Sequence, residues 1–338
     1  MNKTSREEII ELFKEIINGL NLCSNENVEK MLSQALQDNA GAFENNQLSN
    51  EIGQRNLQAS WLLLKQGGHI HQDFDDIGFR VFSQNNEDGI LLYIFTMLGT
   101  VGKVAVEIGA NCGDSKIGFP QCNSANLVVN HGWNSLIMDG SELHISQLTH
   151  FFARSLNTKH FHWLDRKSLK PGESYYYVPL LRQSMITAEN INDLISAENI
   201  GGEIDLLSID VDGMDYWIWD AIDVISPRVV VVEYNKRISQ ELAVTVPYEK
   251  DFVVDLSTKD IWDYNGTSLL GLEKLGQKKG YTLVGTDSNR INAFFVRDDL
   301  AKDLFKPINI TALHSDQKCL SIQPEDYFKK VQELKQFV

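Results

Sequence analysis

Short apolar runs alternate with helical segments from about residue 100 onward. Five of these runs end in an acidic residue or asparagine at or just past the run: KVAVEIG (103–109), NSLIMDG (134–140), KHFHWLD (159–165), DLLSIDVDG (205–213) and RVVVVEYN (228–235). This alternation predicts an α/β fold with a mostly parallel sheet and crossover helices. Ligands of open α/β sheets bind outside the carboxyl ends of the strands, so these polar residues predict a functional site at that edge.

The composition is that of a soluble globular protein with one large domain and an extension. The chain has 338 residues, 43% hydrophobic and 23% charged, with a formal net charge of -15. Such an acidic balance argues against nucleic acid as the main partner, because phosphate binding needs a basic face. No apolar run approaches the roughly 20 residues of a membrane span, and the N-terminus lacks the pattern of a secretory signal. The four cysteines show no metal-type spacing, which predicts free thiols in a cytoplasmic protein.

The two ends of the chain are predicted to lie outside the main domain. Residues 1–75 are predicted to form a helical extension, in which Thr4 and Glu7 have the spacing of a capping box. Apolar residues at helical spacing follow, and a helix is also predicted in NEIGQRNLQASWLLLKQ (50–66). These helices carry no recognisable chemistry and suit packing or homo-oligomerisation. Residues 306–338 are predicted to be a tail with a helix.

The turn after the first apolar run is rich in small and polar residues. Glu107, Gly109, Asn111 and Gly113 follow one another at a spacing of two, and Asp114 comes next. A dinucleotide loop needs Gly-x-Gly-x-x-Gly to approach a pyrophosphate, and the carboxylates here oppose an anion. They suit a cationic ligand, and S-adenosylmethionine carries a sulfonium and an ammonium group. EIGANCG therefore resembles the first motif of class I S-adenosylmethionine-dependent methyltransferases.

The second run ends in Asp139, followed by Gly140, about 30 residues after the turn. A carboxylate at this place accepts the ribose hydroxyls of nucleotides, whether of NAD or of S-adenosylmethionine. Two later runs, 281–285 and 292–297, are joined by TDSNR and predict an antiparallel hairpin. A sheet closed by such a pair resembles the Rossmann-like seven-stranded methyltransferase order 3-2-1-4-5-7-6, with strand 7 antiparallel. This resemblance implies that Asp165, at the end of the third run, holds the adenine amino group.

Two further segments narrow the resemblance. FSQNNEDGIL (82–91) precedes the first run, and LLSIDVDGMDYWIW (206–219) spans the fourth. Together they resemble the FkbM-type methyltransferases, which typically show Ser-Gln-x-x-Glu-Asp and Ile-Asp-x-Glu/Asp-Gly segments. The resemblance covers about residues 80–300 and implies a methyltransferase domain over 76–305. It implies that Glu87 faces the cofactor or acceptor, whereas the same segment also fits a helix start capped by Ser83 or Asn85.

Oxygen ligands gather after the fourth and fifth runs. Asp210, Asp212 and Asp215 follow the fourth run, and Glu233 and Asn235 end the fifth. We expect the catalytic groups to be Asp210, Asp212 and Glu233, since methyl transfer to a neutral hydroxyl needs a base or a metal. Asp210, Asp212, Glu233 and Asn235 would hold Mg²⁺ or another divalent cation. In the alternative, Asp210 orients the cofactor's ammonium group, Asp212 caps the next helix and no metal binds.

The connection over 236–268 is long and lies at the predicted functional edge. Connections of this kind are usually lids or specificity segments. Its aromatic rings and hydrogen-bonding groups suit a sugar, and they are supplied by Tyr248, Trp262, Tyr264 and Asn265. The predicted acceptor residues are Tyr248, Trp262 and Tyr264, together with Asn235 just before the connection.

These patterns predict an O-methyltransferase that uses S-adenosylmethionine and acts on a hydroxyl of a carbohydrate or glycosylated metabolite. The partners expected are thus a small-molecule or glycan acceptor, without nucleic acid. One alternative is a non-catalytic binding or scaffold protein on the same fold. The other is an NAD-dependent oxidoreductase, which would need the phosphate loop that EIGANCG does not match.

Overall fold

The computed structural model describes residues 51–70, 73–112, 120–154, 179–239, 241–252 and 265–310, together with residues 327 and 329. The chain divides into two compact units, Met1–Asn56 and Leu57–Val338, and the sheet with its covering helices belongs to the second. Residues 51–66 form the helix predicted there. The helices predicted nearer the N-terminus, and most of the tail beyond residue 310, lie outside the described residues.

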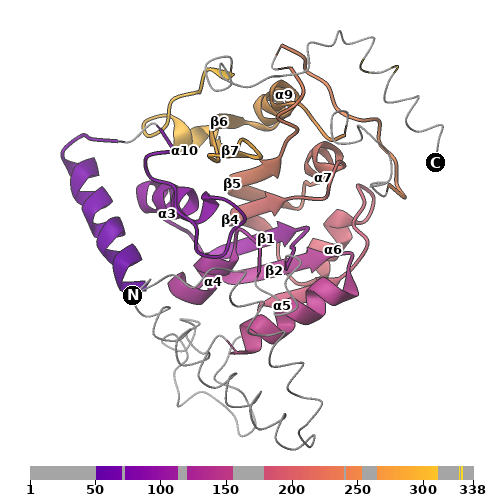
Figure 1. The fold of residues 1–338 in the computed structure, drawn as a ribbon, viewed down its shortest axis with the longest axis horizontal. Coiled ribbons are helices and arrows are strands. Elements are labelled where there is room, and N and C mark those ends of the chain that lie inside the picture. Colours follow the sequence, from indigo (N-terminus) through magenta and orange to yellow (C-terminus); the bar gives the residue numbers. More distant parts are fainter. Residues whose placement is uncertain are drawn as a thin grey trace, which may run out of the picture. The chain divides into compact units, whose positions relative to one another are not determined.

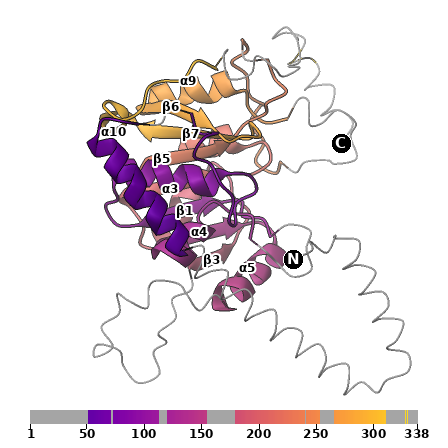
Figure 2. The same cartoon turned by 60° about the vertical axis from the view of Figure 1, so that its left-hand side comes forward.

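A seven-stranded mixed sheet with the order β3-β2-β1-β4-β5-β7-β6 forms the centre of this unit (Figures 1 and 2). Its strands are β1 (Val104–Ile108), β2 (Asn134–Asp139), β3 (Leu180–Gln183), β4 (Gly202–Ile209), β5 (Ile225–Glu233), β6 (Tyr281–Thr286) and β7 (Asn292–Arg297). The first five strands are parallel, and β7 lies antiparallel between β5 and β6. The predicted α/β class, strand order and closing hairpin are confirmed.

The position of β3 corrects one prediction. The strand that pairs with β2 is Leu180–Gln183, with Leu136 beside Leu180 and Asp139 beside Gln183. The run at 159–165, expected in this place, lies outside the described residues. β3 has only four residues and is partly exposed, because it is the edge strand, so its sequence lacks the long apolar run that marks a central strand.

Helices cover both faces of the sheet. They are α3 (Glu87–Leu98), α4 (Ala125–His131), α5 (Glu142–Arg154), α6 (Ile191–Ala197), α7 (Asp215–Ala221), α9 (Leu269–Lys279) and the short α10 (Asp298–Ala301). Val106 and Ile108 of β1 share one buried core with α6, α7 and α9, for example with Trp219. Since side chains alternate along a strand, Glu107 turns to the opposite face, where it meets the start of α4. Within the described residues, no helix has the length and apolar character needed to cross a membrane.

A buried ionic group holds the amino edge of the sheet. The Asp205 carboxylate accepts hydrogen bonds from the backbone N–H groups of Val101 and Gly102, at 2.8 and 3.0 Å. The guanidinium of Arg228 lies 3.6 Å from the same carboxylate. The buried carboxylate at this edge therefore has both hydrogen-bond donors and an opposite charge.

Candidate functional site

The carboxyl ends of β1 and β4 approach each other closely. Gly109 follows β1 with φ 82°, and a Cβ atom at this position would lie 1.5 Å from the backbone oxygen of Asp210. Any side chain would therefore collide with the backbone that follows β4. A glycine is required here by the left-handed conformation and by this contact, which brings Asp210 beside the turn.

A first cavity, of about 170 Å³, opens at the carboxyl ends of β1, β2 and β4. Four residues predicted from sequence to bind the cofactor line it, namely Gly109, Asp139, Gly140 and Asp210. Apolar side chains line it as well, including Met185, Ile186, Met214, Ile218 and Phe252. The arrangement combines apolar walls with a few carboxylates, as is usual for small-molecule sites.

A second cavity, of about 180 Å³, lies beyond β4 and β5 and shares Asp212 with the first. Glu233, Asn235 and Asn265 line it together with Asp215. Neither cavity alone reaches the roughly 300 Å³ of an ordinary small-molecule site, but the two together do. Two ligands placed in these cavities would meet at Asp212. The backbone of Asp212 is in the left-handed region, with φ 54°.

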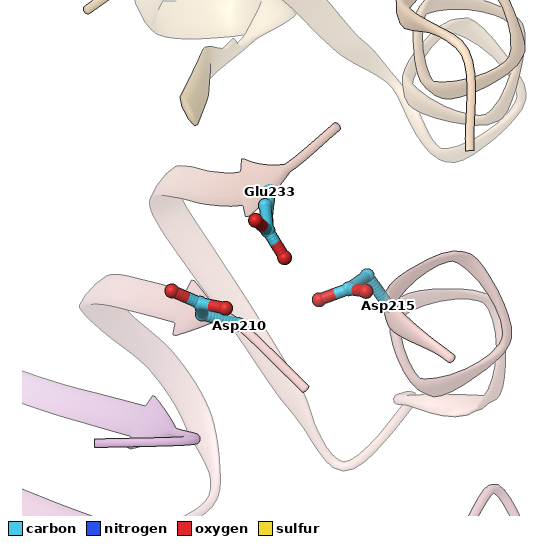
Figure 3. A group of neighbouring side chains, drawn as sticks. All are labelled: Asp210, Asp215 and Glu233. Atoms are coloured by element: carbon cyan, nitrogen blue, oxygen red, sulfur yellow. The ribbon is translucent and has the colours of Figure 1, made fainter. Parts of the chain in front are cut away.

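Three carboxylates converge between β4, α7 and β5 (Figure 3). Asp210, Asp215 and Glu233 each offer an oxygen atom within 4.8 Å of the others. Burial and the charge of Asp215 raise the pKa of Asp210 to about 8. Burial and the charge of Asp210 raise the pKa of Glu233 well above its usual range. Without a cation, this cluster therefore retains a proton at neutral pH.

Asp215 also organises the turn that begins α7. Its two carboxylate oxygens accept the N–H groups of Val211 and Gly213, at 2.9 and 3.0 Å. Gly213 has φ 137°, and a Cβ atom there would lie 2.5 Å from Oδ1 of Asn265. The glycine thus lets Asn265 approach the turn, where its Nδ2 donates to the backbone oxygen of Asp212 at 2.6 Å.

Asp139 is the last residue of β2, and neighbouring groups contact one of its two carboxylate oxygens. Oδ1 accepts the N–H of Ser141 at 2.7 Å and lies 3.2 Å from Nδ1 of His144. No hydrogen bond within the described part of the chain uses Oδ2. Burial raises the pKa of this carboxyl, and the contacts with Ser141 and His144 oppose that shift. His144 is thus a positioning residue for Asp139.

Glu107 is predicted from sequence to bind the cofactor. The structure places its carboxylate at the start of α4, on the face of the sheet opposite to Val106 and Ile108. Oε1 accepts the N–H of Asn123 at 2.6 Å, and Oε2 accepts the N–H and the hydroxyl of Ser124. The side chain is 3% exposed and does not line the first cavity. Its carboxylate holds the start of α4 in place.

Glu87 is also fully buried away from both cavities. Its carboxylate accepts hydrogen bonds from the backbone and side chain of Asn85, at 2.7 and 2.8 Å, and from Nδ2 of Asn292 at 2.9 Å. Asp88 beside it accepts the N–H groups of residues 81, 82 and 83. The expected helix start is present, but the residue before α3 is Asn86 rather than Ser83 or Asn85.

The remaining predicted residues separate into three groups. Asn111 pairs with Gln121 in an isolated β-bridge. Tyr248, predicted to contact the acceptor, lines the first cavity, whereas Asn235 lines the second. Gly113, Asp165, Trp262 and Tyr264 lie outside the described residues, as does part of the connection over 236–268.

Sequence analysis missed the residues that follow β3. Met185 and Ile186 line the first cavity directly after this strand. The short apolar run VPLL (178–181), just before Arg182, is the sequence pattern that indicates this strand. The longer run at 159–165 was interpreted as the third strand instead.

No protein-family model matches this chain, and no curated protein matches it. A function for the chain is therefore inferred from the geometry and chemistry of the two cavities.

Proposed function

We propose that this chain is a class I O-methyltransferase that uses S-adenosylmethionine, similar to the FkbM type, and acts on a hydroxyl of a carbohydrate or glycosylated metabolite. One observation carries the proposal. The first cavity lies at the carboxyl ends of the adjacent strands β1 and β4, which is the switch point of the strand order, and an acidic residue ends the neighbouring strand β2. Open α/β sheets bind nucleotides at this point.

The lining of the first cavity fits the groups of this cofactor. Oδ2 of Asp139 is available to the ribose hydroxyls, and His144 holds the carboxylate in position. Met185 and Ile186 offer apolar surface to an adenine ring. A sulfonium or ammonium group beside Asp210 and Asp212 would favour the ionised forms of these carboxyls, whose pKa values burial raises, whereas a pyrophosphate would oppose them. Once bound, the cofactor supplies a methyl group on a positively charged sulfur.

The second cavity is suited to the acceptor, because it meets the first at Asp212. Asp212 and Glu233 line it and can accept the proton that the acceptor hydroxyl releases on methylation. Glu233 in its ionised form is a stronger base than an ordinary glutamate, because burial and the charge of Asp210 raise its pKa. Asn235 and Thr267, on the same cavity, offer hydrogen bonds to a polyhydroxylated ligand.

Calorimetric titration with S-adenosylhomocysteine tests the cofactor assignment. We expect binding to the wild-type chain, and Asp139→Ala should weaken it by about 2–4 kcal/mol through the loss of charge-assisted hydrogen bonds. Asp220→Asn is the matched control, because Asp220 lies on α7 and pairs with Lys278 at 2.8 Å. Heat on titration with NAD, and none with S-adenosylhomocysteine, would overturn the proposal in favour of the oxidoreductase.

A further inference from the structure

The three converging carboxylates have the spacing of one coordination sphere. Metal–oxygen distances are about 2.0–2.1 Å for Mg²⁺ and about 2.3–2.6 Å for Ca²⁺, so oxygens on opposite sides of one ion lie about 4–5 Å apart. One oxygen each of Asp210, Asp215 and Glu233 lies within 4.8 Å of the others. In Figure 3 the side chain of Glu233 points between the other two carboxylates. A single ion can therefore contact all three.

A fourth oxygen in the second cavity is buried and has no partner. Asn265 is 7% exposed, and its Oδ1 accepts no hydrogen bond within the described residues. The side chain cannot relieve this by rotating its amide, because Nδ2 already donates to the backbone oxygen of Asp212 and a flip would oppose two oxygens. Its backbone is held as well, since its carbonyl accepts Nδ2 of Asn235 at 2.7 Å. A buried acceptor of this kind is unfavourable unless a ligand satisfies it.

The role of Asp215 in the turn before α7 does not account for the cluster. Each of its oxygens accepts one backbone N–H and retains a second lone pair. Asp210 and Glu233 take no part in the turn. None of the three carboxylates forms an ion pair within the described part of the chain, although the basic residues Lys236 and Arg237 line the same cavity. The cluster thus lacks a cation of its own.

We propose that Asp210, Asp215, Glu233 and Oδ1 of Asn265 form a site for one divalent cation. Carboxylate and amide oxygens are the ligands that Mg²⁺ and Ca²⁺ prefer. This set differs from the one expected from sequence, because Asp215 and Asn265 replace Asp212 and Asn235. Binding of the ion does not depend on the proposed function. Its role does rest on that function: an ion here borders the second cavity and can lower the pKa of an acceptor hydroxyl, and because Glu233 is then a ligand, Asp212 is the carboxylate that accepts the proton.

Titration of the full chain with the metal alone tests the site. After treatment with EDTA and desalting, we expect saturable binding of one Mn²⁺ by electron paramagnetic resonance, with competition by Mg²⁺ or Ca²⁺. Glu233→Gln and Asn265→Ala should each weaken binding by roughly tenfold or more, because each removes one ligand. Asn265→Asp retains the ligand oxygen and adds a charge, although its second oxygen then faces the backbone oxygen of Asp212, so it should bind the ion more tightly than Asn265→Ala. Asp220→Asn should leave the affinity unchanged.

The outcomes separate this proposal from the cofactor assignment. No saturable Mn²⁺ binding below about 1 mM would overturn the metal site, as would unchanged affinity in both Glu233→Gln and Asn265→Ala. If Glu233→Gln does not fold, the Mn²⁺ affinities of the wild type, Asn265→Ala and Asn265→Asp still test the site. Calorimetry with S-adenosylhomocysteine on the metal-free protein is an independent measurement, so either assignment can fail alone.

Discussion

At the scale of single residues, Asp210 carries the largest electrostatic consequence. It follows β4 beside Gly109 and borders the first cavity. Its pKa of about 8 arises from burial and from the neighbouring carboxylates. Between pH 4 and 8 the folded state therefore holds a proton that the unfolded state has released. The contribution of Asp210 to the free energy of unfolding therefore falls as the pH rises through this range.

This linkage can be measured by urea unfolding of the metal-free protein between pH 5 and pH 8. We expect the wild type to lose stability with rising pH, and Asp210→Asn to show a shallower dependence, by at most about 1.4 kcal/mol per pH unit for each proton involved. The neutral amide also removes the charge that raises the pKa of Glu233, which acts in the same direction. Asp220→Asn should follow the wild type. Parallel curves for Asp210→Asn and the wild type would contradict the assignment.

At the scale of elements, residues 241–252 act as a strap along the first cavity. Tyr248 on this strap donates its hydroxyl to Glu189 at 2.6 Å and accepts the N–H of Ala188 at 3.2 Å. Trp217 of α7 anchors the strap, because its Nε1 donates to the backbone oxygen of Val246 at 2.8 Å. The strap thereby joins the segment after β3 to the segment after β5.

Tyr248→Phe should loosen the strap while leaving its aromatic packing intact. The lost hydrogen bonds are worth about 1 kcal/mol, so we expect S-adenosylhomocysteine to dissociate roughly fivefold faster. Stopped-flow displacement measures this rate, and Tyr216→Phe serves as the control because Tyr216 does not line either cavity. An unchanged dissociation rate would show that the strap does not retain the ligand.

The elements differ in how well the sequence predicts them. β1, β4 and β5 are central strands buried on both faces, so each appears as a continuous apolar run. β3 is an edge strand with polar, exposed positions, and its place was predicted wrongly. The hairpin of β6 and β7 was predicted because turn residues separate two short runs.

Part of the candidate site, the meeting of Asp210 and Glu233, was predictable from the parallel arrangement of the strands. Parallel strands place their carboxyl ends together, which brings Asp210 and Glu233 to one edge. The direction of a side chain near a strand end depends on register and on neighbouring loops. Sequence alone therefore did not reveal that Glu107 turns toward α4, or that Asn265 reaches the turn at Gly213.

At the scale of the whole molecule, the two edges of the sheet differ in electrostatics. The amino edge pairs its charges, with Asp205 against Arg228 and Glu203 against Arg297. The carboxyl edge gathers carboxylates that repel one another. The paired charges of the amino edge therefore stabilise the fold. At the carboxyl edge, a cationic ligand would relieve the repulsion among the carboxylates.

Asp205→Asn tests this separation. It removes the charge opposite the mostly buried Arg228 and weakens the hydrogen bonds to the loop before β1. Breaking a buried pair costs about 3–5 kcal/mol, so we expect a loss of that size in the free energy of unfolding. Calorimetry under folding conditions should show the same affinity for S-adenosylhomocysteine as the wild type. A loss of affinity without a loss of stability would contradict the separation.

The insertion of β7 between β5 and β6 sets when the site can be completed during synthesis. Glu233 pairs with Asn292, and Tyr234 donates its N–H to Ile291, so the end of β5 gains its neighbour only after the hairpin has left the ribosome. Until then Val229–Val232 form an apolar edge strand, which can pair with other nascent chains. A chain of this topology is thus most exposed to aggregation during translation of its last strands, before the candidate site is complete.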